Sequence, residues 1–379
     1  MKKNVLIYST YHLPYQSGIT IGMDRVWVDL KRLVNLRVIC FNHAQNKLET
    51  QSVNGYETTY MPYLFRFTKG FISPQSLYYF IQNINRFSVV IVNFPNTEAL
   101  VLCLLTKLFR KKLILHYHCN IDLGSSLSHR FISFVVNTTG FVEAFFADKV
   151  IFNKNYSKRL FVGKVFKNKI IEVIPPIKQY PINKSFQLKL ENLKGGDFLV
   201  GFGGRIAAEK GIEFLIDSLV LLRENHNLST KLLLAGPQIS SVVGEESYQT
   251  MILEKLKTSR LDYKFLGNLE EDEMGAFLAS LDLLVLPSIN STESFGMVQA
   301  EAMVLGTPVV ASDIAGVNTP LLLSKMGLLV SPKSTSELAN AVLEILTNKQ
   351  KYSNQLLVDN ARKYFNIKGL VDVYLDLIS

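Results

Sequence analysis

The sequence of 379 residues has only three cysteines, at Cys40, Cys103 and Cys119. None of them belongs to a C-x-x-C pair, so the chain offers neither a disulfide framework nor a cysteine-based metal site. We expect all three thiols to be buried apolar side chains in a protein of a reducing compartment. Hydrophobic residues make up 48% of the chain, which is enough for sizeable cores in two or three domains.

Long hydrophobic runs are also missing. The longest apolar stretches are residues 99–105 and 131–147, and polar residues interrupt the second one. Neither reaches the roughly 20 apolar residues that a membrane-spanning helix needs. The basic pair Lys2-Lys3 is followed by too few apolar residues for a secretory signal peptide. We therefore expect a cytoplasmic protein.

The charges are divided unevenly along the chain. Residues 1–190 contain 25 Lys and Arg against 9 Asp and Glu, a net charge of +16, whereas residues 191–379 contain 16 against 23, a net charge of −7. A basic half is typical of a surface that meets lipid headgroups, a lipid diphosphate or nucleic acid. No recognised nucleic-acid-binding motif occurs, so we expect no nucleic-acid partner. Peripheral binding to the anionic inner face of the cell membrane is one hypothesis, and an ordinary solvated surface is the alternative.

Residues 293–308, Glu-Ser-Phe-Gly-Met-Val-Gln-Ala-Glu-Ala-Met-Val-Leu-Gly-Thr-Pro, predict a helix. The helix lies between two short apolar runs that predict buried strands. Ser294 is the predicted N-cap. Gly306 suits the left-handed position after the last turn, and Pro308 prevents the helix from continuing.

Two glutamates bracket the start of this helix. Glu293 precedes it, and Glu301 lies five residues beyond Gly296, which is roughly 7.5 Å along the helix axis. The free N–H groups of the first turn attract anions, and Gly296 would let an anion approach closely because it has no Cβ. A ligand with phosphates in the middle and hydroxyls at both ends, such as a nucleotide-sugar, fits this layout. Two solvated glutamates at this spacing by chance remain the alternative.

A second motif follows the predicted strand 198–202. It begins with Gly203-Gly204-Arg205, and Lys210 precedes a helix that starts near Ile212. Glycines let a phosphate reach the backbone, the Arg205 guanidinium can bind two phosphate oxygens at once, and Lys210 adds a point charge. Taken alone, both cations could equally be surface side chains.

Together the two motifs resemble the signatures of the retaining glycosyltransferases of family four, glycosyl transferases group 1. The resemblance covers nearly the whole chain and is strongest in residues 198–332. It implies an α/β protein with the GT-B fold, in which two Rossmann-like, doubly wound parallel-sheet domains face a cleft. It also implies donor contacts for Glu293 with the sugar hydroxyls and for Glu301 with the ribose. The groups it places at the donor diphosphate are Gly204, Arg205, Lys210, Phe295, Gly296 and Met297.

The first residues of the chain support the fold. Strand, loop, helix and strand follow one another over residues 5–41, which predicts a parallel, doubly wound sheet, although the G-x-G-x-x-G dinucleotide fingerprint is absent. The opening resembles the family's loop beside the donor phosphates. Gly18 occupies the position of its second glycine, whereas Ser17 departs from the pattern at the first. A simple turn glycine is the alternative for Gly18.

His118 follows the predicted strand 113–117, at the strand end where open α/β sheets bind ligands. It aligns best with a family histidine near the reacting sugar, so the resemblance implies a catalytic role. A structural histidine is the alternative, and we favour that role for His116. Because no third ligand is in view, we expect no metal at this histidine pair.

The resemblance divides the chain into an acceptor-binding domain, residues 1–178, and a nucleotide-sugar-binding domain, residues 196–362. The polar segment 178–196 breaks the hydrophobic periodicity and is the predicted linker. A terminal helix, about residues 363–379, is expected to pack back on the first domain.

The predicted function is a retaining hexosyltransferase. It would move a sugar from a nucleotide diphosphate-sugar, such as a UDP-sugar, to a glycan or lipid-linked acceptor in bacterial-type surface polysaccharide or glycoconjugate synthesis. The donor is a substrate, and no cofactor is expected. No D-x-D-type metal motif stands in a suitable loop, so the two cations would act in place of a metal. The alternatives are a sugar-nucleotide epimerase of GT-B-like fold and a non-catalytic nucleotide-sugar-binding protein.

Overall fold

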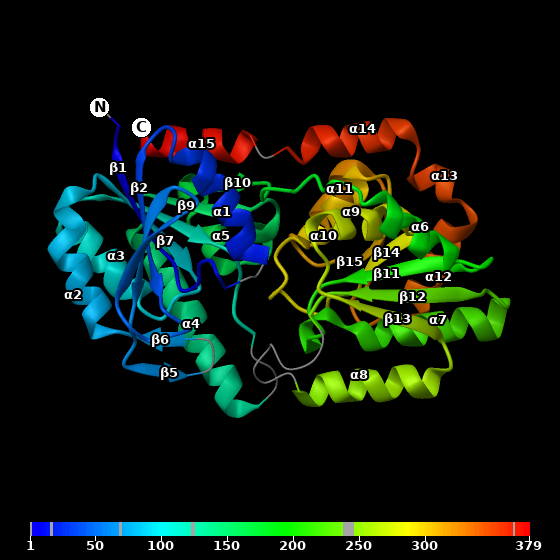
Figure 1. Ribbon diagram of the computed structural model, residues 1–379. Helices are drawn as coiled ribbons and strands as arrows, with labels where there is room; N and C mark the ends of the chain where they lie inside the picture. The colour runs from blue at the N-terminus through cyan, green and yellow to red at the C-terminus, as the bar shows by residue number, and fades with distance from the viewer. Residues whose placement is uncertain (1, 16–17, 68–69, 123–125, 238–245, 367) are drawn as a thin grey trace. The chain divides into compact units, whose positions relative to one another are not determined.

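The computed structural model divides into two compact units (Figure 1). Unit 1 comprises residues 1–176 and 367–379, and unit 2 comprises residues 177–366. The structure describes residues 2–15, 18–67, 70–122, 126–237, 246–366 and 368–379. Ser17 therefore lies outside the described residues.

Unit 1 is built on an eight-stranded sheet with the strand order β10-β9-β8-β7-β1-β2-β4-β3. All neighbouring strands are parallel except β3, which runs antiparallel to β4 at the edge. A separate hairpin is formed by β5 (Phe65–Phe67) and β6 (Gly70–Ile72). The strands of the main sheet are β1 (Asn4–Tyr8), β2 (Asn35–Phe41), β3 (Glu49–Val53), β4 (Tyr56–Met61), β7 (Val89–Phe94), β8 (Lys112–Tyr117), β9 (Lys149–Asn153) and β10 (Ile170–Val173).

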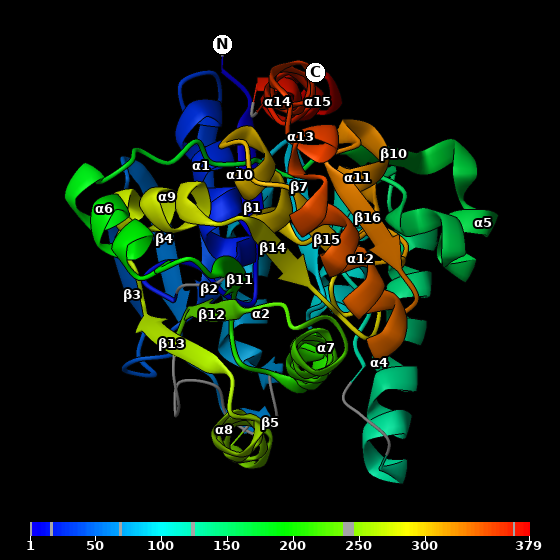
Figure 2. The ribbon, with the colours of Figure 1, turned by 90° about the vertical axis from the view of Figure 1, so that its right-hand side faces the viewer.

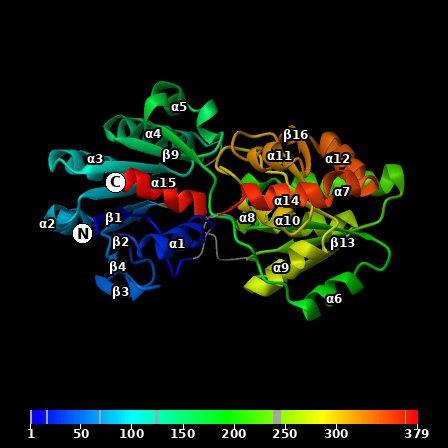
Figure 3. The same ribbon diagram turned by 90° about the horizontal axis from the view of Figure 1, so that it is seen from above.

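Helices cover both faces of this sheet, because its strands are apolar on both sides. Leu6 and Tyr8 pack toward helices α2 (Pro74–Asn83), α3 (Ala99–Leu108) and α4 (Leu127–Phe146). Val5 and Ile7 pack toward α1 (Gly18–Leu30) and α15 (Lys368–Ile378). Figure 3 shows α3, α4 and the short helix α5 (Phe161–Val165) along the same side of unit 1.

Unit 2 contains a six-stranded parallel sheet with the strand order β13-β12-β11-β14-β15-β16. Figure 2 shows α7, α8 and α12 on one side of it and α9, α10 and α11 on the other. The strands are β11 (Phe198–Gly203), β12 (Thr230–Ala235), β13 (Asp262–Gly267), β14 (Leu283–Leu286), β15 (Val309–Ser312) and β16 (Gly327–Val330). The helices are α6 (Lys184–Asn192), α7 (Ile212–His226), α8 (Glu246–Ser259), α9 (Glu271–Ser280), α10 (Met297–Val304), α11 (Thr319–Ser324), α12 (Thr335–Thr347), α13 (Lys349–Tyr352) and α14 (Gln355–Tyr364).

Two expected segments differ from the sequence prediction. The predicted linker contains α6, whose Leu190 is buried and which packs against α9 in unit 2. The terminal segment is two helices, because the chain leaves helical conformation after Tyr364 and resumes it at Lys368. The second of these, α15, packs against α1 in unit 1, with the rings of Trp27 and Tyr374 5.1 Å apart.

Candidate active site

The two sequence motifs meet at one point of the sheet in unit 2. The strand order reverses between β11 and β14, and open α/β sheets bind ligands beyond the carboxyl ends of the strands at such a point. The loop after β11 contains Arg205 and Lys210, and the loop after β14 contains Glu293. Lys210 and Glu293 are 83 positions apart in the sequence, yet the Lys210 Nζ forms an ion pair and hydrogen bond with the Glu293 Oε2.

Backbone contacts hold these two loops together. The N–H of Ile289 donates a hydrogen bond of 2.9 Å to the carbonyl oxygen of Glu209. Gly211 has a φ of +64°, and a Cβ at this position would lie 2.3 Å from the carbonyl oxygen of Pro287. Only glycine fits both this left-handed conformation and this close approach. The spacing of the two loops is therefore set by the backbone as well as by the ion pair.

The loop after β11 is open on one side at Gly204. Its φ is +146°, and a Cβ built there would have no neighbouring atom closer than the 3.7 Å to Phe202. The next strand end packs behind it, because a Cβ on Gly236 would lie 2.2 Å from the Gly204 carbonyl oxygen. The backbone at Gly204 thus remains approachable from one side, as the sequence predicts for a phosphate-binding loop.

The carboxyl group of Glu293 is held in its ionised form. Its side chain is 16% exposed, and that of Lys210 is 15% exposed. Burial by itself raises the pKa of this carboxyl, but the Lys210 ammonium and the N–H groups of Gly296 and Phe295 outweigh burial and bring the pKa below its ordinary value. The Gly296 N–H donates to Oε1 at 3.0 Å.

Arg205 lies on the same loop and forms an ion pair with Glu209, with Nη2 and Oε1 2.9 Å apart. The Arg205 side chain is 37% exposed, whereas that of Glu209 is 12% exposed. The largely buried carboxylate of Glu209 thus orients the arginine and leaves part of the Arg205 side chain exposed. Glu209 was not predicted as a site residue, although its position four residues after Arg205 is a spacing typical of paired charges on a helical turn.

The start of α10 differs from the prediction in two ways. The N-cap is Gly296, with a φ of +72°, so the prediction of Ser294 as N-cap is wrong. The left-handed glycine turns the chain into the helix two residues later than expected. In addition, a Cβ on Gly296 would lie within 2.5 Å of side-chain atoms of Leu286 and Gln299. The left-handed conformation and the packing inside unit 2 therefore both favour glycine at this position.

The other predicted residues of this motif lie around the helix start. Phe295 is buried, with its ring 6.4 Å from that of Phe365, so only its backbone could serve a ligand. Met297 is the first residue of α10 and is half-buried. Glu301 is buried one helical turn further on, where the Tyr180 hydroxyl lies 3.4 Å from its Oε1. One glutamate thus precedes the helix start and the other lies in the second turn of the helix.

Two hydroxyl groups of the loop after β14 belong to residues that were not predicted from the sequence. Ser288 Oγ and Thr292 Oγ1 are buried, and neither has a hydrogen-bond partner within the described part of the chain. Buried hydroxyls without a partner are uncommon. They lie on the loop that ends in Glu293, where a polar ligand could supply the missing bonds. Nothing in the sequence distinguishes them from ordinary loop hydroxyls.

Of the two predicted residues of unit 1, His118 follows the carboxyl end of a strand and Gly18 begins a helix. His118 follows β8 and is buried, with its Nε2 3.3 Å from the Oδ1 of Asn93 on β7. Burial lowers the pKa of His118 to about 3, so the imidazole is neutral near pH 7. Gly18 is the exposed first residue of α1.

His116 has a structural role. Its ring stacks on that of His118, with centroids 4.0 Å apart, and its Nδ1 lies 2.5 Å from the hydroxyl of Tyr374 on α15. Burial and the neighbouring His118 hold the pKa of His116 well below its usual range. The described residues contain no group of three His, Cys, Asp or Glu side chains arranged to hold a metal ion.

Comparisons with known proteins agree with these observations. Residues 183–364 match the family model described as glycosyl transferases group 1. An uncharacterized glycosyltransferase of Methanocaldococcus jannaschii is 30% identical over 191 residues, which are 49% of this chain and 46% of that protein. The matches thus span between about a third and about half of the length of the curated relatives.

The solved structures match over both units. Sucrose-phosphate synthase from Thermosynechococcus elongatus aligns with a TM-score of 0.76 and 17% identity, covering 99% of this chain and 98% of that one. HepE of Anabaena in complex with UDP-glucose aligns with a TM-score of 0.73 and 18% identity, covering 98% and 99%. At this identity the likeness shows the fold alone, and it confirms the GT-B fold predicted from the sequence.

Proposed function

Since residues 183–364 belong to the glycosyl transferases group 1 family, we propose that the protein is a retaining glycosyltransferase. It transfers a hexose-type sugar from a nucleotide diphosphate-sugar to an acceptor hydroxyl. The observation that carries the proposal is the meeting of Lys210 and Glu293 at the reversal point of the unit 2 sheet. That arrangement brings a cation that can neutralise a phosphate next to a carboxylate that can accept hydrogen bonds from sugar hydroxyls.

The donor diphosphate would lie along the loop after β11. Arg205 and Lys210 supply the positive charge, and Gly204 leaves the backbone accessible. The N–H groups at Phe295, Gly296 and Met297, at the positive end of α10, face the same charge. The Gly296 N–H and Lys210 both contact Glu293, so donor binding would redistribute these hydrogen bonds.

The hydroxyls at the two ends of the donor would meet the two glutamates. Glu293, ionised and fixed by Lys210, accepts hydrogen bonds from the transferred sugar. Glu301 accepts hydrogen bonds from the ribose on the other side of the helix start. Supporting this assignment, both carboxylates lie within one and a half turns of the same helix terminus.

The reaction needs charge stabilisation as the bond between sugar and diphosphate breaks. Negative charge develops on the leaving diphosphate, and Arg205, Lys210 and the start of α10, once in contact with the bound donor, stabilise it without further reorganisation. We propose that these groups make the transfer independent of a metal ion. Neutral His118 would then serve as a hydrogen-bonding partner near the reacting sugar and not as a proton acceptor near pH 7.

Unit 1 would bind the acceptor, with Gly18 beside the donor phosphates. We infer a glycan or a lipid-linked glycan as acceptor, in the synthesis of a bacterial-type surface polysaccharide or glycoconjugate at the cytoplasmic face of the membrane. The support is the basic first half of the chain, since a lipid diphosphate or an anionic surface complements its charge.

Thermal denaturation with a panel of nucleotide diphosphate-sugars tests the proposal, because a ligand that binds the native state raises its melting temperature. We expect at least one donor to stabilise the wild type and to lose most of this effect with Lys210→Ala. The matched control is Lys257→Ala, an exposed lysine of α8 in the same unit. Equal stabilisation of both variants by every donor would refute the assigned site.

The other candidate functions, an epimerase and a binding protein without turnover, can be distinguished from a transferase by the products that form. An epimerase would convert the bound donor in acceptor-free buffer. A binding protein without turnover would be stabilised by a donor and yet release no nucleotide diphosphate with any acceptor. A transferase releases nucleotide diphosphate only in step with glycosylation of the acceptor, apart from slow donor hydrolysis.

A further inference from the structure

Helix α4 of unit 1 presents its apolar side to solvent. Phe131 and Phe134 are each 68% exposed and Phe145 is 59% exposed. Together with Leu127 and Val135 they recur at helical spacing and form one stripe along the helix. The opposite side, which packs into the unit, includes Ser133, Gly140 and Glu143. A helix of a soluble domain normally has the reverse arrangement.

The neighbouring helices extend this apolar surface. On α3, which packs against α4, Leu104 and Leu108 are exposed at i and i+4. On α5, Phe161 and Val165 are exposed at the same spacing. The Phe141 ring of α4 stacks on Phe161, with centroids 5.3 Å apart, and so joins the two helices. Contiguous exposed apolar patches of this kind mark interaction sites.

The chain that follows α4 is rich in cations. From Lys149 to Ile171 the chain has seven Lys and Arg residues and no Asp or Glu. They are Lys149, Lys154, Lys158, Arg159, Lys164, Lys167 and Lys169. The Lys169 Nζ lies 5.7 Å from the ring centroid of Phe145 and donates to the Phe145 carbonyl oxygen at 2.6 Å, so charged and aromatic groups interleave.

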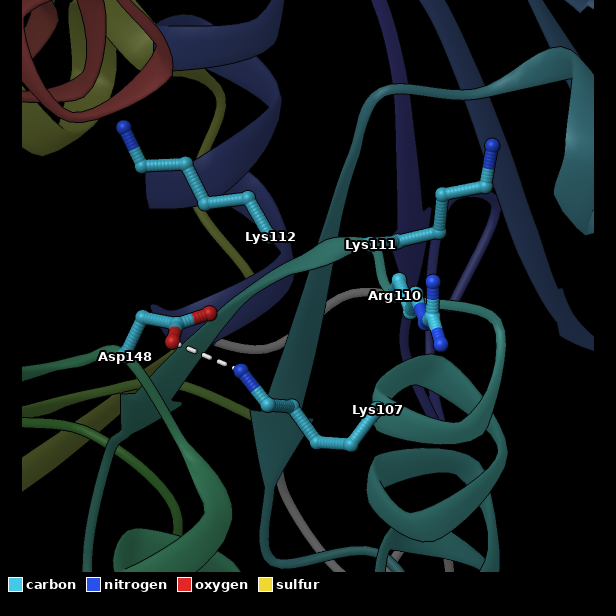
Figure 4. Close-up of a pocket in the computed structure, with 5 residues that line it drawn as sticks. All are labelled: Lys107, Arg110, Lys111, Lys112 and Asp148. Carbon is cyan, nitrogen blue, oxygen red and sulfur yellow. Dashed lines mark hydrogen bonds and ion pairs between the residues drawn. The ribbon is translucent and has the colours of Figure 1, made fainter.

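A second group of cations lies beside the end of α3. Figure 4 shows an open hollow lined by Lys107, Arg110, Lys111, Lys112 and Asp148. The single carboxylate is bound to Lys107, with Nζ and Oδ1 2.7 Å apart, which leaves the hollow with a net positive charge. Burial lowers the pKa of the Lys169 ammonium, and the charges of Asp148 and Lys107 also act on it. Lys169 therefore lies near the residues of the hollow as well as near Phe145 of α4.

We propose that this basic-aromatic face, formed by the exposed apolar side chains of α3, α4 and α5 and the cations around them, docks unit 1 on an anionic lipid bilayer. The phenylalanine rings enter the interfacial layer, and the lysines and arginines bind the lipid phosphates. The face is independent of the residues that contact the donor, so this inference stands apart from the proposed reaction.

Charge decides against a second copy of the chain as the occupant. A two-fold symmetric dimer through this face would set the same cations of both copies against each other. An anionic bilayer instead matches both the apolar stripe and its basic surround, and each near-surface cation adds about fivefold to the binding constant.

Sedimentation with phosphatidylcholine vesicles, with and without phosphatidylglycerol, tests the inference on the full chain. We expect the wild type to bind only the anionic vesicles at low salt. Lys164→Gln/Lys167→Gln should weaken this binding about 25-fold, and Phe131→Ser/Phe134→Ser should weaken it at least about tenfold. Lys257→Gln/Lys363→Gln and Leu356→Ser, exposed positions of unit 2, are the matched controls and should bind like the wild type.

The melting temperatures of all variants are recorded alongside. Because the replaced side chains are exposed, the substitutions should leave the melting temperatures unchanged. Failure of the wild type to bind anionic vesicles would overturn the inference. So would wild-type dimers that dissociate on Phe131→Ser/Phe134→Ser, because the face would then join copies of this chain. Equal weakening by the control variants would show binding through general charge and would overturn it as well.

Discussion

The ion pair between Lys210 and Glu293 offers the sharpest test of the site's physics. Both side chains are more than four-fifths buried. Replacing Lys210 by methionine keeps the aliphatic stem and leaves Glu293 as a buried carboxylate without its cation. Breaking a buried pair in this way costs about 3–5 kcal/mol. Glu293 retains hydrogen bonds from the Gly296 and Phe295 N–H groups, so we expect the lower end, about 3 kcal/mol.

The pH dependence of this loss has a definite sign. In the wild type the pKa of Glu293 is lowered by folding, so the stability it contributes is present above its unfolded pKa and is lost as the pH falls through the folded pKa. Without Lys210 the effect of burial remains and raises this pKa. The variant's deficit should therefore be largest near pH 7 and shrink toward pH 4, where the carboxyl group takes up a proton.

A double-mutant cycle with Glu293→Gln measures the coupling. Glutamine keeps the shape and removes the charge, so Lys210→Met should cost far less in that background, with a coupling energy of about 1–3 kcal/mol. The single tryptophan, Trp27, lies in unit 1, so far-UV circular dichroism is the signal to follow in chemical denaturation. A coupling energy near zero, or a deficit independent of pH, would refute the reasoning.

Three further predictions concern single positions. Gly211→Ala should lower the stability by at least about 1 kcal/mol and weaken donor binding, because φ is +64° and the added methyl group would meet the neighbouring loop. Gly369→Ala, with open space around the added methyl group, is the control. Equal effects of the two substitutions would contradict the loop contact. Burial raises the pKa of Glu143 to about 8, so folding should weaken as the pH rises from 4.5 to 8. Glu143→Gln should therefore stabilise by at least about 2 kcal/mol at pH 8 and change little at pH 4.5; an equal effect at both pH values would be the contrary result. His118, with a pKa of about 3, should show no ring titration by NMR between pH 5 and 8, and His118→Asn should remove about one proton from the dependence of stability on pH between 6.5 and 3; a ring that titrates near pH 6.5 would contradict its burial.

Strands with continuous apolar runs could be predicted from the sequence because burial on both faces leaves a clear pattern. The runs at residues 113–117 and 198–202 both fall within observed strands. Gly306 takes the predicted left-handed conformation, with a φ of +96°. In contrast, β3 is exposed on most of its residues, and the hairpin strands β5 and β6 have three residues each, too few to show a period.

The candidate site divides in the same way. Glycines and charged residues in two motifs predicted which loops matter, because their backbone and charge requirements are local. The sequence could not predict which partner each charge would find: Glu293 binds Lys210, and Arg205 binds Glu209. It also misassigned the helix cap to Ser294, since the choice of Gly296 depends on tertiary packing against Leu286.

The exposed apolar side of α4 was not predicted either. Its phenylalanines indicate a bulky apolar helix in the sequence, which is equally typical of a buried one. Only the fold shows that Ser133 and Glu143 face inward while Phe131 and Phe134 face solvent. Among the described residues, no helix has both the length and the hydropathy to cross a bilayer.

The central claim is that a donor diphosphate binds between the loop after β11 and the start of α10. A crystal structure with a nucleotide diphosphate-sugar tests it most directly. We predict phosphate oxygens within hydrogen-bonding distance of Arg205, Lys210 and the backbone N–H groups around Gly296, with the sugar at Glu293 and the ribose at Glu301. A diphosphate bound away from these groups, with the pair of Lys210 and Glu293 undisturbed, would contradict the account.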